Sequence, residues 1–460
     1  MYVCFFFGHV HTFQKILHRE ELSLDTYLKW AEVYGPVYRI NIIHIVLINV
    51  TCPEATKEIL MSLKYTKDRI LHKQLFYVFG ERFIGNCMIT TPDTELWYKH
   101  RRFIEPAFSN LYLKGRMDTL NEMGEKLMDK LSQMSDSKTK VSMLHLFNCV
   151  TMDVLAKVAL GVDLNLLQKT SPFPQAVETC LKGMLHNVRD MLFRFNPKNR
   201  QLIKEVRKAC RLLRTSGAQW IKERRVAMQN GDDVPKDFLT QIIKTPGEGR
   251  LTPEDEECML DNFVAFFIAG QETTANMMAF CLMELGRHPD ILEKVKKEVD
   301  DVIGMKQDIS YDHLGHLGYL SQVLKETLRL YPPAPASTRD IAEALVIDGI
   351  HVPAGVTCML NTYVTGRMER FFKDPLTFDP DRFHPNAPKP YYCYYPFSLG
   401  PRSCLGQSLA LMETKVVMAK LLQRFDFTLL PGQSFEIRDT GTLRPKGGVM
   451  CYVTHRDHNK

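Results

Sequence analysis

The pattern of hydrophobic and polar positions changes along the chain: it predicts strands near both ends and helices between them. Two early runs rich in isoleucine and valine, residues 37–43 and 45–50, predict strands. The last third predicts a tight hairpin over 345–352 and a strand over 425–430. Because the predicted strands gather at both ends, we expect them to pair in space within one domain that spans residues 1–460.

Helical periodicity dominates the remainder of the chain. Apolar residues recur at three- and four-residue spacing in several stretches, namely 120–131, 153–160, 203–226 and 414–424. The longest pattern follows a break at 245–250 and begins with Thr252, Pro253 and acidic residues, which are typical of a helix start. It runs to Gly286 and is apolar on most faces, so we expect a helix that threads the core.

Composition and charge narrow the function classes. The 460 residues are 45% hydrophobic and 24% charged, an ordinary globular balance. A net charge of +6 is spread along the chain, which argues against nucleic-acid binding but suits an acidic partner or an anionic membrane surface. Twelve cysteines without a CxxC motif suggest reduced thiols in a cytosolic environment. The apolar patch 2–7 is too short to span a bilayer, so we expect no membrane anchor in this chain.

One cysteine lies in a distinctive loop near the C-terminus. Cys404 precedes a predicted helix over 407–420, whose N-terminus favours an anionic thiolate. Gly400 permits a tight turn and Gly406 permits a close approach to a flat group. The spaced residues are Phe397, Gly400, Arg402, Cys404 and Gly406. This loop resembles the haem-binding loop of the cytochrome P450 superfamily, and the alternative is an inert buried cysteine.

Further motifs support the resemblance, which extends over almost the whole chain. It implies a mainly α fold, a large helical domain around haem b with a small β-rich region. Cys404 would ligate iron and Phe397 would shield its sulfur. Arg402, Trp97, Arg101 and Arg339 would hold the haem propionates. Glu326, Arg329 and Arg382 would form a buried structural network; taken alone, the first two suggest only a surface ion pair.

The sequence Ala269-Gly270-Gln271-Glu272-Thr273-Thr274 interrupts the long helix with a costly glycine. It resembles the oxygen-activation groove of the superfamily. The resemblance implies that Ala269 and Gly270 leave room for dioxygen, and that Glu272 and Thr273 form a proton relay. Ala334 would face the substrate. The alternative is a tolerated flaw in a stable helix.

Six other stretches are similar to sterol side-chain hydroxylases of this superfamily, namely 34–37, 79–82, 261–264, 319–325, 374–378 and 415–424. They imply conversion of cholesterol to 24-hydroxycholesterol with O2 and electrons from NADPH through the microsomal cytochrome reductase. The basic residues Lys99, Arg102 and Lys415 are candidate reductase contacts. We expect the cytosolic face of the endoplasmic reticulum membrane, with surface contact near 191–195. Alternatives are a monooxygenase for other steroids, fatty acids or xenobiotics, and a haem-binding paralogue without turnover.

Overall fold

The computed structural model describes residues 8–18, 21–43, 45–190, 192–245 and 252–458. It is 56% helix and 12% strand, which confirms the mainly helical fold. The helices are α1 Val10–His18, α2 Ser23–Tyr34, α3 Pro53–Met61, α4 Arg69–Phe76, α5 Thr94–Ile104, α6 Asn110–Lys114, α7 Met117–Ser132, α8 Met143–Leu155, α9 Phe173–Arg189, α10 Arg200–Gln229, α11 Phe238–Lys244, α12 Pro253–Arg287, α13 Pro289–Val302, α14 Tyr311–His316, α15 Gly318–Leu330, α16 Thr362–Thr365 and α17 Gln407–Arg424.

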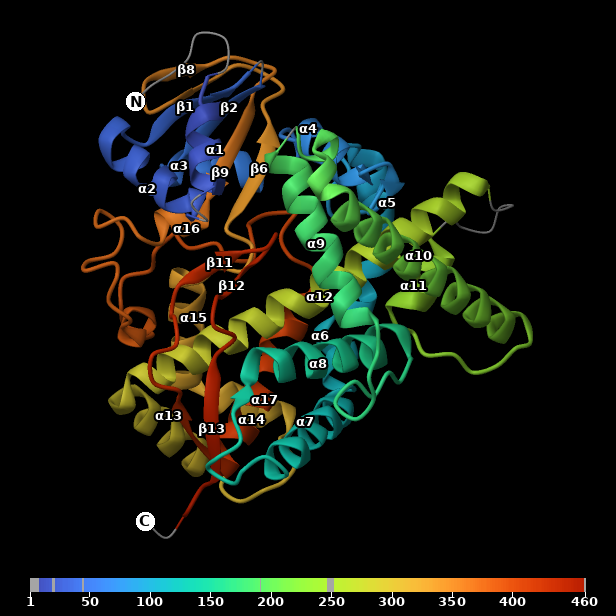
Figure 1. The fold of residues 1–460 in the computed structure, drawn as a ribbon, viewed down its shortest axis with the longest axis vertical. Helices are drawn as coiled ribbons and strands as arrows, with labels where there is room; N and C mark the ends of the chain where they lie inside the picture. Colours follow the sequence, from blue (N-terminus) through green and yellow to red (C-terminus); the bar gives the residue numbers. More distant parts are fainter. Residues whose placement is uncertain (1–7, 19–20, 44, 191, 246–251, 459–460) are drawn as a thin grey trace.

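The strands are short and fall into small sheets. They are β1 Val37–Ile42, β2 Ile45–Val50, β3 Tyr77–Val78, β4 Glu81–Arg82, β5 Val141–Ser142, β6 Ala336–Asp340, β7 Leu345–Ile347, β8 Ile350–Val352, β9 Thr357–Asn361, β10 Phe425–Leu429, β11 Ile437–Asp439, β12 Leu443–Pro445 and β13 Met450–His455. Figure 1 shows β1, β2, β9 and β6 at the end of the molecule that carries α1 to α3, with the larger helical part below.

The pairing of strands from distant parts of the chain agrees with expectation in one sheet and differs in another. β2 pairs in parallel with β9, and the sheet order is β1-β2-β9-β6. Strands from the start and the last third of the sequence therefore meet. The C-terminal strands β10 and β13 do not join this sheet; β13 pairs instead with β5 in the order β10-β13-β5. A two-residue strand such as β5 carries no periodicity from which to predict it.

Helix α12 crosses the core as its pattern predicts (Figure 1). Thr252 and Asp255 form a capping box: the Thr252 hydroxyl accepts from the Asp255 backbone N–H at 3.1 Å, and the Asp255 carboxylate accepts from the Thr252 N–H at 3.1 Å. The helix has 35 residues and packs against α8, α10, α15 and α17. It therefore presents the segment 269–274 in the middle of the helical part. The break at 246–250 lies outside the described residues.

The turn between β7 and β8 has the residue types that a tight hairpin needs. Asp348 and Gly349 adopt φ values of 50° and 75°, which suit the two central residues of a tight hairpin turn between β7 and β8. The predicted helix 153–160 is instead the end of α8, followed by a π turn over Ala156–Leu160. Among the described residues, Met143–Leu160 alone has the length and hydropathy of a membrane span, but 83% of it is buried. It is thus a core element.

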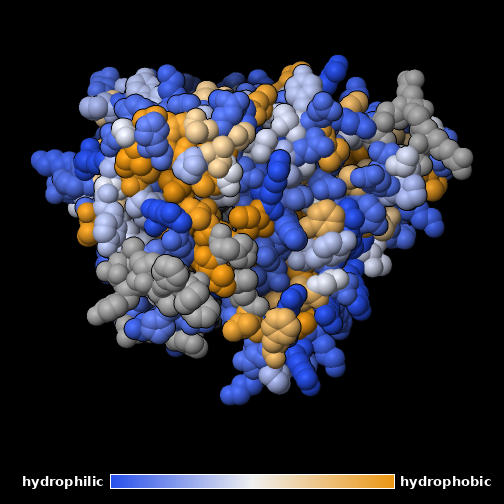
Figure 2. Space-filling view, turned by 90° about the horizontal axis from the view of Figure 1, so that it is seen from above, coloured by the Kyte–Doolittle hydropathy of each residue, from blue (hydrophilic) through white to orange (hydrophobic). Residues whose placement is uncertain are grey.

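The expected surface contact near 191–195 is partly wrong. Phe193 is 7% exposed and stacks between Phe79 and His186, so it belongs to the core. Leu192 and Phe195 are exposed, at 64% and 66%. Met191 and the apolar stretch 2–7 lie outside the described residues. Figure 2, which looks down on the end of the molecule that carries the four-stranded sheet, shows apolar side chains gathered into a patch among polar ones.

Candidate functional site

The Cys404 loop is shaped by one glycine and one backbone hydrogen bond. Gly400 has φ +70°, and an added Cβ would lie 2.3 Å from the Leu60 carbonyl oxygen. The Cys404 N–H donates to the Phe397 carbonyl at 2.8 Å. Helix α17 begins at Gln407, immediately beyond Gly406. The geometry therefore places Cys404 at a helix N-terminus, as the sequence predicts.

The electrostatics of Cys404 combine opposing effects. Its side chain is open to solvent at the loop surface, yet surrounding protein atoms desolvate the sulfur, and this burial raises the pKa of the thiol. Backbone N–H groups of Gly406 and Gln407, and the charge of Arg101, act in the opposite direction. Burial is the larger effect, so the pKa of the Cys404 thiol lies above its ordinary value. Among the described residues, an added Cβ at Gly406 would meet Cys404 Sγ alone, at 3.9 Å, so the role of this glycine toward a flat ligand stays a prediction.

A cluster of cations lies beside this loop. Arg402 stacks on Trp97, with its guanidinium carbon 4.2 Å from the ring centroid. Burial, and then the charge of Arg339, lower the pKa of Arg402. Lys67 joins the same group: burial, and then the charges of Arg339 and Arg402, lower the pKa of Lys67 to about 7. Lys67 belongs to no motif, so sequence reasoning missed it.

The cluster fits an anionic ligand. The Nη2 atoms of Arg339 and Arg402 are buried and have no hydrogen-bond partner among the described residues. The neighbouring acids Asp68 and Asp93 are already N-caps of α4 and α5. Two buried guanidinium groups with unsatisfied donors, with Lys67 nearby and a thiol at a helix start, suit the two propionates and the iron of haem.

Arg101 departs from the predicted arrangement. It extends from α5 to the cysteine loop, where Nη1 donates to the Ser403 carbonyl at 3.0 Å. Its Nη2 forms an ion pair with Glu105 at 3.3 Å. Arg101 thus braces the loop that carries Cys404, and its predicted contact with a propionate stays untested.

Glu326, Arg329 and Arg382 meet in one network, in which the Glu326 and Arg329 side chains are fully buried. Arg329 Nε and Nη2 donate to the two Glu326 oxygens at 2.7 Å each. Arg382 Nε lies 3.4 Å from Glu326 Oε1. Arg329 also donates to the carbonyls of Pro375 at 2.7 Å and Thr377 at 3.1 Å. The Glu326–Arg329 ion pair is therefore fully buried and hydrogen-bonded to the chain at 375 and 377. This arrangement favours a structural role over that of a surface ion pair.

The predicted relay residues lie together on α12. The Thr273 hydroxyl donates to the Ala269 carbonyl one turn earlier, at 2.8 Å. Glu272 is 4% exposed, and burial raises the pKa of its carboxyl. Its Oε1 accepts from the Thr442 hydroxyl at 2.8 Å, a partner 170 residues away that no sequence pattern indicated. At neutral pH this carboxyl is consequently easier to protonate than an exposed one.

Of the small residues near the relay, Gly270 has a packing contact that the sequence did not predict. An added Cβ at Gly270 would lie 2.7 Å from Leu155 Cδ1 of α8, so close packing against this side chain favours glycine there. Ala269 is only partly buried, and Ala334 is exposed. The room for dioxygen assigned to Gly270 thus has a competing explanation, whereas the substrate roles of Ala269 and Ala334 remain predictions.

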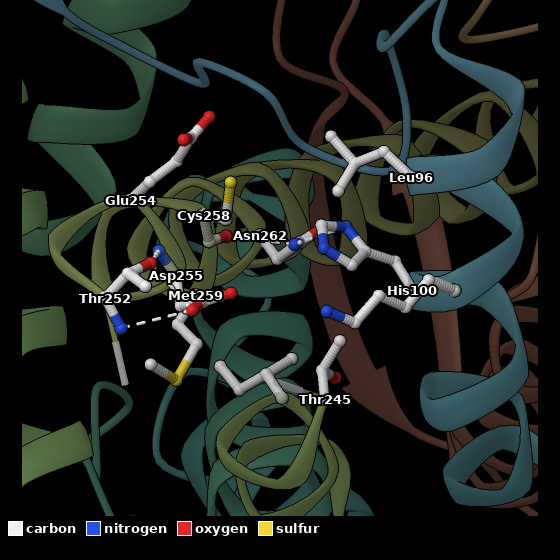
Figure 3. A pocket seen from close by; sticks show the side chains of 11 residues that line it. Leu96, His100, Thr245, Thr252, Glu254, Asp255, Cys258, Met259 and Asn262 are labelled. Carbon is white, nitrogen blue, oxygen red and sulfur yellow. Dashed lines mark hydrogen bonds between the residues drawn. The ribbon is translucent and has the colours of Figure 1, made fainter. Parts of the chain in front are cut away.

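A small cavity of about 120 Å³ lies elsewhere, between α5, the end of α11 and the start of α12. Figure 3 shows His100 and Asn262 pointing towards one another inside it. Asn262 Nδ2 lies 3.1 Å from His100 Nδ1, and burial lowers the pKa of His100 to about 4, so the imidazole is neutral. The lining residues do not include Cys404, Glu272 or Thr273. This cavity is therefore separate from the predicted oxygen site.

Comparison with known proteins defines the class. The family model "Cytochrome P450" matches residues 3–452, so the chain belongs to the cytochrome P450 family. Cytochrome P450 4d2 of Drosophila melanogaster is 28% identical over 456 residues, covering 93% of this chain and 88% of the relative. Human cytochrome P450 4F2 is 29% identical over 405 residues, covering 83% and 76%. Human cytochrome P450 3A7 is 28% identical over 455 residues, covering 95% and 87%. The family cofactor is haem bound through a cysteine thiolate, and its reaction requires O2 and a redox partner.

Proposed function

We propose that this chain hydroxylates an unactivated C–H bond of an apolar substrate from the steroid, fatty-acid or xenobiotic classes. The observation that carries the proposal is Cys404, placed at the start of α17 beside the cations Lys67, Arg339 and Arg402. Haem held there supplies activation of dioxygen and insertion of one oxygen atom into the substrate. The protein supplies binding, orientation and protons.

The residues of the chain divide these tasks. Cys404 binds iron, and the N–H groups of Gly406 and Gln407 stabilise its thiolate. Arg402, Arg339 and Lys67 bind the propionates. Glu272 carries a proton on a carboxyl that burial keeps easily protonated, and Thr273 passes protons onward through its hydroxyl. Glu272 is buried, so bulk water does not take over its role as proton donor.

Electron delivery and location are also part of the proposal. Lys99 and Arg102 are exposed and flank a surface groove of about 470 Å³ along α5, which suits an acidic reductase that carries electrons from NADPH. Lys415 is a weaker candidate, because it is partly buried and its Nζ donates to the Leu314 carbonyl at 2.7 Å. We place the protein on the cytosolic face of the endoplasmic reticulum membrane, with the exposed side chains of Leu192 and Phe195 facing lipid.

Hydroxylation of cholesterol at C24 is a narrower form of this proposal. It rests on short stretches similar to cholesterol 24-hydroxylase. The relatives compared above belong to numbered families 4 and 3A, so the broader substrate range has the better support. The exposed Ala334 offers no bulky side chain to restrict the substrate to one ring system.

The proposal is tested by turnover. The holoprotein is incubated with the microsomal reductase, NADPH and a set of sterols, fatty acids and drug-like molecules, and the products are identified by mass spectrometry. We expect an NADPH-dependent gain of one oxygen atom in at least one class. A haem-loaded chain that modifies none of them, while oxidising no NADPH above the reductase alone, would support the non-catalytic alternative. A 24-hydroxylated product from cholesterol would support the narrower form.

A further inference from the structure

The turn between β11 and β12 contacts the predicted proton donor directly. Thr442 Oγ1 lies 2.8 Å from Glu272 Oε1 and 3.0 Å from Asn276 Nδ2. An amide nitrogen can only donate, so Asn276 occupies an acceptor site of the hydroxyl. The single hydroxyl proton is then directed to the Glu272 carboxylate. Glu272 and Asn276 are four residues apart and lie on the same face of α12.

Thr442 is itself held firmly. Gly441 has φ +100°, and an added Cβ would lie 3.2 Å from the Leu181 carbonyl oxygen of α9. The Thr440 N–H donates to the Thr442 carbonyl at 3.0 Å, and the Leu443 N–H donates to the Pro333 carbonyl at 2.9 Å. The turn is thus fixed on both sides of Thr442, and its hydroxyl has little freedom to follow a moving carboxyl.

The same hairpin is bound to α9 by two ion pairs. Asp439 pairs with Arg189, and Arg444 pairs with Glu178 at 2.7 Å. Arg444 and Glu178 are also the charged groups that act on Glu272, with opposite signs. Helix α9, the hairpin and the carboxyl of α12 therefore form one connected unit.

We propose that Thr442 is a positioning residue for the monooxygenase reaction: its hydroxyl fixes the Glu272 carboxyl in one orientation and favours its ionised form. This inference rests on the proposed function. The inference adds Thr442, a residue of a distant turn, to the relay. Proton delivery then depends on the packing of the β11–β12 hairpin against α9. A fixed carboxyl returns to the same place after each proton transfer.

The test uses three holoenzyme variants. Thr442→Val removes the hydroxyl with little change in shape, and Thr442→Ser restores it. Thr440→Val is the matched control, because within the described part of the chain the Thr440 hydroxyl hydrogen-bonds only to the Thr442 carbonyl, at 3.4 Å, in the same turn. The Glu272 carboxyl band is identified in infrared difference spectra by its loss in Glu272→Gln and is titrated with pH. Hydrogen peroxide released per NADPH is measured alongside.

We expect the ratio of carboxylate to carboxylic acid at Glu272 to fall by about tenfold in Thr442→Val at a given pH, the effect of losing one hydrogen bond to a charged group. The pKa of Glu272 rises further, and the share of NADPH diverted to peroxide increases. Thr442→Ser and Thr440→Val should match the wild type in both measurements. A merely structural role for Thr442 would affect stability without moving the carboxyl titration.

Two outcomes overturn different claims. If Thr442→Val and Thr440→Val give the same carboxyl titration and the same peroxide yield, the positioning role of Thr442 is wrong while the proposed function stands. If the wild type lacks the carbon monoxide spectrum of a thiolate-bound haem, the proposed function fails first, and this inference fails with it.

Discussion

The Gly270→Ala substitution separates helix packing from oxygen access. The added methyl would lie 2.7 Å from Leu155 Cδ1 and 3.2 Å from Leu155 Cδ2, so the Leu155 side chain or one of the helices α8 and α12 must shift. Overpacking of this kind costs about 1–3 kcal/mol. The gain from replacing a helical glycine with alanine is about 1 kcal/mol. We therefore expect a net loss of about 0–2 kcal/mol in the free energy of unfolding.

A second substitution tests the cause. Leu155→Ala alone should cost about 2–5 kcal/mol by leaving a gap. In that background the Gly270→Ala methyl enters free space, so it should be neutral or stabilising, with a coupling of about 1–3 kcal/mol. Gly315→Ala is the control, because an added Cβ in α14 meets nothing within 4 Å.

The assay is urea unfolding of the holoprotein followed by circular dichroism, with unchanged slopes required for comparison. Equal destabilisation by Gly270→Ala in both backgrounds, within about 0.5 kcal/mol, would refute the packing explanation. Peroxide release completes the test. If Gly270 also makes room for oxygen, the double variant Leu155→Ala/Gly270→Ala should be at least as stable as Leu155→Ala but should still release excess peroxide.

Two further predictions concern buried charges. Glu326→Gln leaves Arg329 buried without its counter-charge and should destabilise the protein by about 3–5 kcal/mol in the same assay. Glu293→Gln removes an exposed carboxylate that pairs at the same spacing with Lys296; it should cost at most about 1 kcal/mol, because Lys296 keeps its ion pair with Asp426. Equal effects of the two substitutions would contradict the assignment. Lys67 has a folded-state pKa of about 7 against an ordinary value of 10.5, so the unfolded chain binds more protons between these pH values and the apoprotein should gain stability as pH rises from about 7 to 10.5. Lys67→Met should flatten this part of the urea-midpoint profile, and an unchanged slope would show that Lys67 is not desolvated.

Local signals in the sequence predicted much of the fold. The strand 45–50 has the bounds of β2, and the cap at Thr252 marks the start of α12. Both depend on neighbouring residues alone. The bounds of α8 and the existence of β5 were not predicted, because a π turn and a two-residue strand depend on packing against other elements.

The residues of the site also fall into two groups, those that the local sequence reveals and those that only the folded chain brings together. Cys404 and its glycines lie within one short loop, so spacing was sufficient to find them. Lys67 and Thr442 reach the site from distant segments and belong to no motif, so only the folded chain brings them to Arg402 and Glu272. Phe193 shows the reverse error: the cluster of apolar residues at 191–195 suggested a surface contact with the membrane, but Phe193 is buried against Phe79, 114 positions earlier in the numbering.

The central claim is that the Cys404 sulfur binds haem iron as a thiolate. The most direct measurement is the absorption spectrum of the reduced protein with carbon monoxide, recorded for the wild type and for Cys404→Ser, with the buried thiol variant Cys281→Ser as control. The account predicts a strongly red-shifted Soret band in the wild type and in Cys281→Ser, and its loss in Cys404→Ser. A wild-type Soret band at the position of histidine-bound haem, or a band that survives in Cys404→Ser, would contradict it.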